Sequence, residues 1–247
     1  MNLDLTPAAV AAPRRRQVRA HALTEAALLL RNGEQLLLAL VIPIGILVAG
    51  RWFAAPLGLS FDEIAVSVLG LAIWSTCFTS LAITTAFERR YNVLERLAAT
   101  PLGTSGVLLG KTLAFAMITA AQVAVLAAVA FAIGWRPQPE AGHLLVAVAA
   151  SLLAMTVFAA LGLALAGSTR AETTLGVANL VYLLGTAAGV LTPVDRFPGW
   201  SQQLVGALPT AALGEALRTG TPLSLPILAA WCIAGLLLAR KVFSWTS

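Results

Sequence analysis

The chain alternates between long uncharged stretches and short charged segments. No formal charge occurs from Ile64 to Phe87, and further uncharged stretches follow at 112–135, 143–169, 173–194 and 219–239. An α-helix rises about 1.5 Å per residue, so roughly 20 apolar residues cross the ~30 Å hydrocarbon core of a bilayer. The pattern therefore predicts an all-α polytopic membrane protein.

A shorter apolar stretch at residues 35–50 adds a further predicted span. It ends at Arg51, whose side chain can extend to the interface, and neighbouring helices can satisfy the carbonyl that Pro43 leaves free. The six predicted transmembrane helices cover residues 35–53, 64–86, 112–134, 143–167, 174–192 and 223–240. We expect a cytoplasmic N-terminal part at 1–34, followed by one transmembrane domain at 35–247.

The basic residues are distributed unequally between the two sets of loops. If the N-terminus is cytoplasmic, twelve of the sixteen lysines and arginines lie in inner segments, and only Arg51, Arg136, Arg196 and Arg218 lie outside. Cytoplasmic loops of membrane proteins carry such an excess. Both termini are therefore expected in the cytoplasm, and the net charge of +5 needs no nucleic-acid partner.

Residues 17–33 have the pattern of an N-terminal interfacial helix. One stripe is apolar and the charged positions lie off it; the stripe is Val18, Ala22, Ala26 and Leu30, and the charged positions are Arg19, Glu25 and Arg31. Such a helix can lie on the inner membrane surface. The alternative is an ordinary extension of the first span.

The inner segment between the second and third spans is the most informative polar segment. Apolar residues at helical spacing (Phe87, Tyr91, Leu94 and Leu97 or Ala98) alternate with the charged residues Glu88, Arg89, Glu95 and Arg96. Thr100-Pro101 should end this helix, and Thr104 or Ser105 should cap the next one. The segment could dock a cytoplasmic partner, or it could be a solvated loop.

The outer segment 193–222 is long for a connection within a helical bundle. It contains four prolines, yet its part 204–218 is apolar enough to dip into the outer leaflet or to cover the bundle. We expect a re-entrant hairpin or a cap before the last span. A loose exterior loop is the alternative.

The composition offers little catalytic chemistry. Hydrophobic residues make up 59% of the chain, charged residues 11%, and the mean hydropathy is +0.86, so no separate soluble catalytic domain is expected. The phosphate-loop-like residues 106–112 are one residue too short for the nucleotide-binding pattern. Two cysteines and two histidines at unrelated positions predict neither a disulfide framework nor a metal site. We therefore expect no catalytic, metal-binding or cofactor-binding residues.

The inner segment FERRYNVLERLAATPL, together with the six spans and the interfacial helix, resembles a known family. The chain is similar to the membrane subunits of the second class of ABC exporters, in particular to permeases of the daunorubicin-resistance type. The outer residues 208–210 and 215–218 (LPT and EALR) support the resemblance. One departure is Asn92-Val93, where the family often has a glycine.

The resemblance implies that the segment after the second span is a coupling helix that binds a separate ATPase subunit. The implied coupling residues are Phe87, Glu88, Arg89, Arg90, Tyr91, Leu94, Glu95, Arg96, Thr100 and Pro101. ATP and Mg would be bound by that ATPase and not by this chain. A second permease, identical or paralogous, would complete the transporter in the bacterial plasma membrane.

The resemblance also implies a path for a hydrophobic substrate, such as a drug or a lipid, near the second and fifth spans. Candidate cavity residues are Trp74, Phe78, Thr79, Asn179 and Tyr182, although ordinary helix packing would also explain them. The scarcity of ionisable groups in the spans argues against an ion-coupled carrier. A membrane-embedded enzyme of lipid or peptide chemistry is the other alternative.

Overall fold

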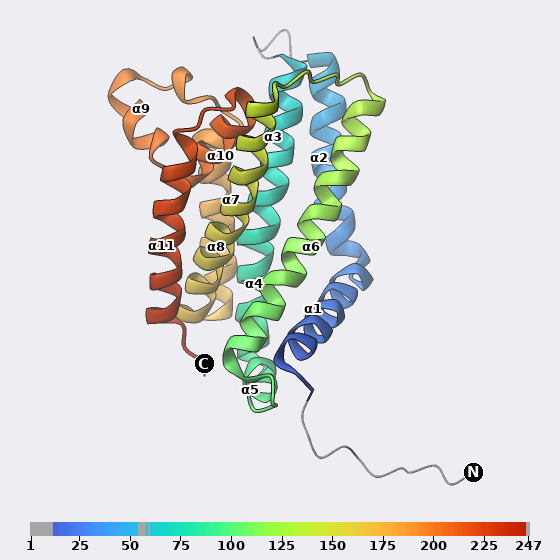
Figure 1. Ribbon diagram of the computed structural model, residues 1–247, viewed down its shortest axis with the longest axis vertical. Coiled ribbons are helices and arrows are strands. Elements are labelled where there is room, and N and C mark those ends of the chain that lie inside the picture. Colours follow the sequence, from blue (N-terminus) through green and yellow to red (C-terminus); the bar gives the residue numbers. More distant parts are fainter. Residues whose placement is uncertain (1–11, 54–57, 59, 246–247) are drawn as a thin grey trace, which may run out of the picture.

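The protein is a bundle of long helices that lie roughly along one axis, as the computed structural model in Figure 1 shows. The structure describes residues 12–53, 58 and 60–245, and in this part of the chain it contains no β-strand. The predicted all-α architecture is confirmed. Residues 1–11 of the predicted cytoplasmic N-terminus lie outside the described residues.

Each predicted span corresponds to a helix or to a run of consecutive helices. The first two elements are α1 (Arg14–Arg31) and α2 (Gly33–Phe53), and the second span combines α3 (Phe61–Trp74), η2 (Ser75–Ser80) and α4 (Leu81–Arg90). After the short α5 (Val93–Ala98) come α6 (Gly103–Ala132), α7 (Ala141–Ser168), and α8 (Ala171–Gly185) with η3 (Thr186–Val190). The chain ends with η4 (Val194–Arg196), α9 (Gly199–Gly206), α10 (Pro209–Thr219) and α11 (Ser224–Val242).

Five helical runs of the described chain are long and apolar enough to cross a membrane: Phe61–Arg90, Gly103–Ala132, Ala141–Ser168, Ala171–Val190 and Ser224–Val242. Helix α2 continues through Pro43, and its apolar part Ala39–Phe53 is shorter. The chain is thus a multi-pass membrane protein. That α2 is a sixth span remains a prediction.

The second span is the central element of the bundle. Its most apolar window is 78% buried, far more than that of the other four long runs. A wider π-helical turn, η2, interrupts it, and there the backbone lies so close to α7 that a Cβ on Gly162 would be 2.9 Å from the Phe78 carbonyl oxygen. The main core forms around this contact and includes Leu71, Trp74 and Phe158.

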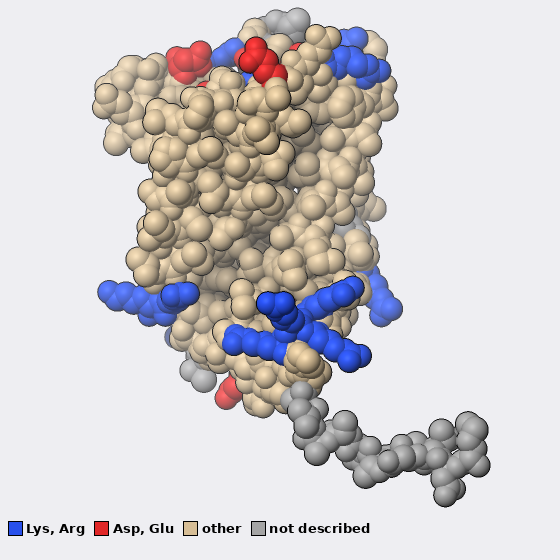
Figure 2. Space-filling model, viewed as in Figure 1, with Lys and Arg blue, Asp and Glu red and all other residues tan. Residues whose placement is uncertain are grey.

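The two ends of the bundle differ in charge. Lys and Arg side chains dominate the end where α1 begins and α11 ends, whereas the opposite end carries both signs, as Figure 2 shows. Basic residues in the last turn of α4 and of α11 contribute to this asymmetry, and there they also interact favourably with the negative ends of the helix dipoles. We refer to this end as the basic end.

The outer segment expected to be re-entrant is folded. It forms η4, α9 and α10 at the end opposite α5 (Figure 1). Helix α10 packs against α3, α7, α11 and η3, and most of its residues from Pro209 to Ala216 are buried. The segment is therefore a cap built into the bundle and not a loose loop, whereas its depth in the bilayer remains a prediction.

Candidate functional site

The predicted coupling segment forms a helix, a turn and a second short helix at the basic end. Helix α4 ends at Arg90, and Asn92 then adopts a left-handed backbone conformation with φ of 56°. Asparagine is among the few residues other than glycine that adopt this conformation readily. Asn92 can therefore form this turn at a position where the resemblance suggests a glycine.

The turn is held by local hydrogen bonds and by one buried anchor. Arg96 donates to the backbone oxygens of Tyr91 (3.1 Å) and Asn92 (3.2 Å), while Leu94 of α5 is fully buried. The Thr100 hydroxyl donates to the Leu97 oxygen at 2.6 Å, and α5 ends at Ala98, as the Thr-Pro signal predicts. The geometry fixes α5 to the bundle while leaving its other face open.

The expected cap of the next helix is wrong. Helix α6 begins at Gly103, so Thr104 and Ser105 lie in its first turn and make no capping hydrogen bond. Gly103 itself has φ of 65°, a conformation that costs glycine little. The turn after Pro101 therefore depends on glycine, and the hydroxyl of Ser105 instead accepts a hydrogen bond from Arg14 of α1 at 2.5 Å.

The ten predicted coupling residues divide into two groups. Six are exposed at the basic end: Arg90, Tyr91, Glu95, Arg96, Thr100 and Pro101. The other four, Phe87, Glu88, Arg89 and Leu94, are half-buried or buried. The exposed group offers both charge signs and an aromatic ring to a partner. The second group secures the segment to the rest of the molecule.

Glu88 belongs to a buried charge cluster with Lys111 of α6 and Glu25 of α1. The Lys111 side chain is completely buried, and its Nζ lies 2.7 Å from Glu88 Oε1 and 3.1 Å from Glu25 Oε2. A lysine is almost never fully buried unless it is paired. The cluster therefore connects the coupling segment to the interfacial helix.

His21 lies beside this cluster on α1. Its ring packs so closely on α6 that a Cβ on Gly110 would be 2.5 Å from His21 Cδ2. Burial lowers the pKa of His21 below its ordinary value of 6.5; the neighbouring Lys111 charge acts in the same direction, and Glu25 opposes it. At neutral pH the ring is therefore uncharged.

Helix α1 packs one face against α6. Ala22 and Ala26 of the apolar stripe are buried there, Glu25 is buried with them, and Leu30 is 55% exposed. Lys111 of α6 offers Glu25 a partner at this contact. A hydrophobicity pattern treats a paired carboxylate as a surface residue and therefore does not predict the burial of Glu25. That the helix lies on the membrane surface remains a prediction.

Arg89 and Arg90 connect the coupling segment to α7, to α8 and to the residues that follow α11. Arg89 donates to the Gly167 oxygen at 2.7 Å, to Ser244 Oγ at 2.8 Å and to the Thr169 oxygen. It thus satisfies carbonyls at the C-terminal end of α7, which have no partner within the helix. Arg90 pairs with Glu172 at the start of α8. Displacement of α4 would therefore act directly on α7, on α8 and on the tail after α11.

The candidate cavity residues do not share one surface in this conformation. Trp74 and Phe78 are only 2% and 4% exposed, their rings stack with centroids 4.4 Å apart, and Trp74 Nε1 donates to the Tyr182 oxygen at 3.1 Å. Thr79 and Tyr182 are half-buried, and Asn179 is exposed on α8. In the single chain the two aromatic rings therefore act as core, and the cavity role of all five remains a prediction.

At the opposite end, Arg218 of α10 holds the irregular end of the fifth span. It donates to the oxygens of Val190 and Gly189, both at 2.8 Å, and to Ser67 Oγ at 3.1 Å, and it pairs with Glu215 at 3.0 Å. Gly189 has φ of 107°, so the chain leaves helical geometry there. The EALR residues of the sequence thus cap the fifth span.

A family model for the ABC-2 type transporter matches residues 16–221 of the chain. The matched region includes the coupling segment, the charge cluster and the cap formed by α9 and α10. The chain belongs to the ABC-2 type transporter family. No curated protein matches it.

As an ABC-2 type transporter, the chain is the membrane component of a transport system that works with an ATP-binding subunit. The exposed group of the coupling segment is then the candidate contact with that subunit. Sequence reasoning missed Glu25 and the structural role of Lys111, although a lysine that opens a long apolar span was a usable signal. It placed Arg218 in the outer segment but did not predict that Arg218 binds the end of the fifth span, because residue spacing reveals neither the break at Gly189 nor the backbone oxygens that the break leaves free.

Proposed function

We propose that this chain is the permease subunit of an ABC exporter that moves a hydrophobic, drug-like or lipid-like substrate across a bacterial plasma membrane. A separate subunit binds ATP and Mg and hydrolyses the ATP. Two permease copies, or this chain and a paralogue, form the pathway between them. Membership of the ABC-2 family supports the transport role, and the scarcity of charge along the spans favours a hydrophobic substrate.

The proposal rests on the structure of the coupling segment, which has one exposed face and several contacts with the rest of the bundle. Its exposed face is displayed at the basic end. Buried Leu94 anchors the same segment, Arg89 links it to α7, and Glu88 links it to Lys111 of α6. A force applied to the exposed face would reach α6 and α7 through direct contacts, and α1 through Lys111. ATP-driven closure of the partner would then favour one of two bundle arrangements.

The orientation belongs to the same proposal. The excess of Lys and Arg at the basic end, seen in Figure 2, is the feature that marks cytoplasmic segments. Both termini and α5 would then face the cytoplasm, where ATP is available. The cap of α9 and α10 would lie on the outer side.

The test is purification of the chain from native membranes in mild detergent, with mass spectrometry of the proteins that accompany it. Glu95 is the best position for a variant because it is exposed and its carboxylate makes no hydrogen bond or ion pair within the described chain. We propose that Glu95 faces a basic group of the ATPase. Glu95→Lys would turn this contact into a like-charge one, which costs several kcal/mol at an interface, and should remove most of the accompanying ATPase. The matched control is Glu140→Lys, an exposed glutamate at the opposite end.

The expected result is a stoichiometric ABC ATPase with the wild-type chain and with Glu140→Lys, and much less with Glu95→Lys. Wild-type chain that is recovered without any ATPase, and that transports or converts a substrate without ATP, would contradict the proposal. Substitution of Glu88 is a poorer test of docking, because loss of its contact with Lys111 would disturb the bundle itself.

A further inference from the structure

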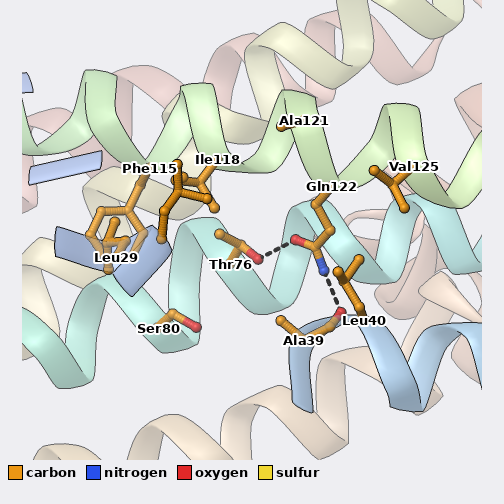
Figure 3. A pocket seen from close by; sticks show the side chains of 11 residues that line it. Leu29, Ala39, Leu40, Thr76, Ser80, Phe115, Ile118, Ala121, Gln122 and Val125 are labelled. Atoms are coloured by element: carbon orange, nitrogen blue, oxygen red, sulfur yellow. Dashed lines mark hydrogen bonds between the residues drawn. The ribbon is translucent and has the colours of Figure 1, made fainter. Parts of the chain in front are cut away.

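A pocket of about 180 Å³ lies between α1, α2, η2 and α6, and none of its lining residues belongs to the predicted coupling segment or to the five candidate cavity residues (Figure 3). Its wall on α6 runs from Phe115 to Val125, and Leu29 and Leu30 of α1 approach from the side. Phe115 is buried, whereas Leu30 and Val125 are exposed. The pocket therefore opens at the side of the bundle.

The position of the pocket along α6 places it at hydrocarbon depth. Lys111 is the last charged residue on this helix, and none follows until Arg136. Phe115 and Val125 are separated by ten residues, or about 15 Å of helix. The pocket thus begins about one turn inside the charge cluster and extends toward the middle of the span. In a bilayer that α6 spans, a side opening at this depth would face acyl chains.

The polar groups in the pocket wall are already satisfied by one another. Thr76 Oγ1 donates to Gln122 Oε1 at 2.7 Å, and Gln122 Nε2 donates to the Ala39 oxygen at 2.7 Å, as the dashed lines in Figure 3 show. These bonds leave the wall with little capacity to recognise a polar ligand. Apart from the Ser80 hydroxyl, the remaining lining is hydrocarbon. The surface is suited to an alkyl chain.

Exposed arginines lie on the helix that borders the opening. Leu29 and Leu30, which line the pocket, are followed directly by Arg31, and Arg15, Arg16 and Arg19 are also exposed on the same helix. Figure 2 shows basic side chains gathered over this part of the molecule. Arginine binds phosphate oxygens through paired N–H donors. A headgroup phosphate beside Arg31 would place its acyl chain at the mouth of the pocket.

We propose that this pocket holds one acyl chain of an anionic phospholipid from the α1-side leaflet, with its phosphate beside Arg31. The lipid is a bound component of the fold: it fills the space between the interfacial helix and the first three spans. Binding requires neither ATP nor the partner subunit.

The experiment uses phosphatidylglycerol with a photoreactive diazirine on one acyl chain, in vesicles that contain the purified full chain. Peptide mass spectrometry after illumination should map adducts to residues 29–40 and 115–125 of the wild-type protein. Ala121→Phe fills the pocket and should reduce these adducts at least several-fold. Ala124→Phe is the matched control, because Ala124 is also exposed on α6 but does not line the pocket. Its labelling should match the wild type.

A second comparison identifies the headgroup. Diacylglycerol with the same diazirine lacks the phosphate and should label the pocket several-fold less than phosphatidylglycerol does, and Arg31→Gln should abolish that difference. Wild-type adducts spread evenly over the exposed faces of α6, α7 and α11 would overturn the proposal without reference to any variant. Equal labelling by the two lipids would overturn the phospholipid assignment in favour of an uncharged hydrophobic ligand.

Discussion

At the scale of single residues, Lys111 shows most clearly how helices of this bundle are held together. Its ammonium group is completely buried and is matched by two carboxylates from different helices, α1 and α4. Removing one member of a buried ionic group leaves the remaining charges without compensation, which costs about 3–5 kcal/mol. The cluster is therefore a point where a single substitution should loosen two helices at once.

We expect Lys111→Met to lower the thermal unfolding temperature of the detergent-purified chain by far more than Lys241→Met, because Lys241 is exposed. The triple variant Glu25→Gln, Glu88→Gln, Lys111→Met should recover part of the loss, since it removes the unpaired carboxylates together with the lysine. Equal melting of the two single variants would show that the cluster contributes nothing to stability.

His21 should make the stability of the interfacial helix depend on pH. In the folded protein, burial is the main cause that lowers the pKa of this imidazole below its ordinary value of 6.5. When the pH falls below 6.5, the unfolded chain therefore binds a proton more readily than the folded one does. The stability that the neutral ring contributes is present above pH 6.5 and is lost as the pH falls below that value. Glu25, Lys111 and the Val107 backbone face the same ring.

The measurement is the melting temperature of the wild type and of His21→Gln from pH 8 to pH 5. The wild type should lose more stability than the variant over the acidic part of this range. The comparison with His21→Gln removes the effect of other groups that titrate there. A constant difference between the two proteins over the whole range would contradict the assignment.

At the scale of elements, the cap depends on a contact that admits no side chain. Gly214 of α10 faces the carbonyl of Gly189, and a Cβ at either position would overlap the other segment. The spacing of Gly185 and Gly189 suggests that another helix packs closely against them. In the structure, Trp74 and Thr210 pack against Gly185, and Ala211 packs against Gly189. The glycines thus serve contacts within the chain.

Gly214→Ala should therefore separate α10 from η3 and weaken the hydrogen bonds that Arg218 makes to the end of the fifth span. Overpacking of this kind typically costs about 1–3 kcal/mol. Gly176→Ala is the control, since no atom lies within 4 Å of the added Cβ and alanine favours a helix. Protease cleavage after η3 should become faster in Gly214→Ala only. Equal cleavage of both variants would argue against the packing account.

The elements themselves follow largely from the sequence, because long uncharged stretches determine where a chain can cross a membrane. The ends of the coupling segment are less predictable. Thr100-Pro101 ends α5 as expected, yet α6 begins at Gly103 without the predicted hydroxyl cap. Residue spacing likewise could not reveal that Glu88 and Arg89 turn inward, since their partners Lys111 and Gly167 come from other helices. Tertiary contacts decide these positions.

At the scale of the whole molecule, the unequal charge of the two ends predicts the topology. The basic end carries α1, α5 and the end of α11, and the opposite end carries the loop between α6 and α7 and the cap. Positive charge near the spans is retained in the cytoplasm during insertion. The coupling segment and the ATP-binding subunit would then meet on the cytoplasmic side.

Single cysteines test this orientation on a background with Cys77→Ala and Cys232→Ala. Gln138→Cys lies in the loop between α6 and α7, Glu95→Cys lies on α5, and both positions are exposed. A membrane-impermeant maleimide should label Gln138→Cys in intact cells and should label Glu95→Cys only after the membrane is opened. The reverse pattern would place α5 on the side without ATP, and the coupling proposal could not then hold, however well its residues fit the family.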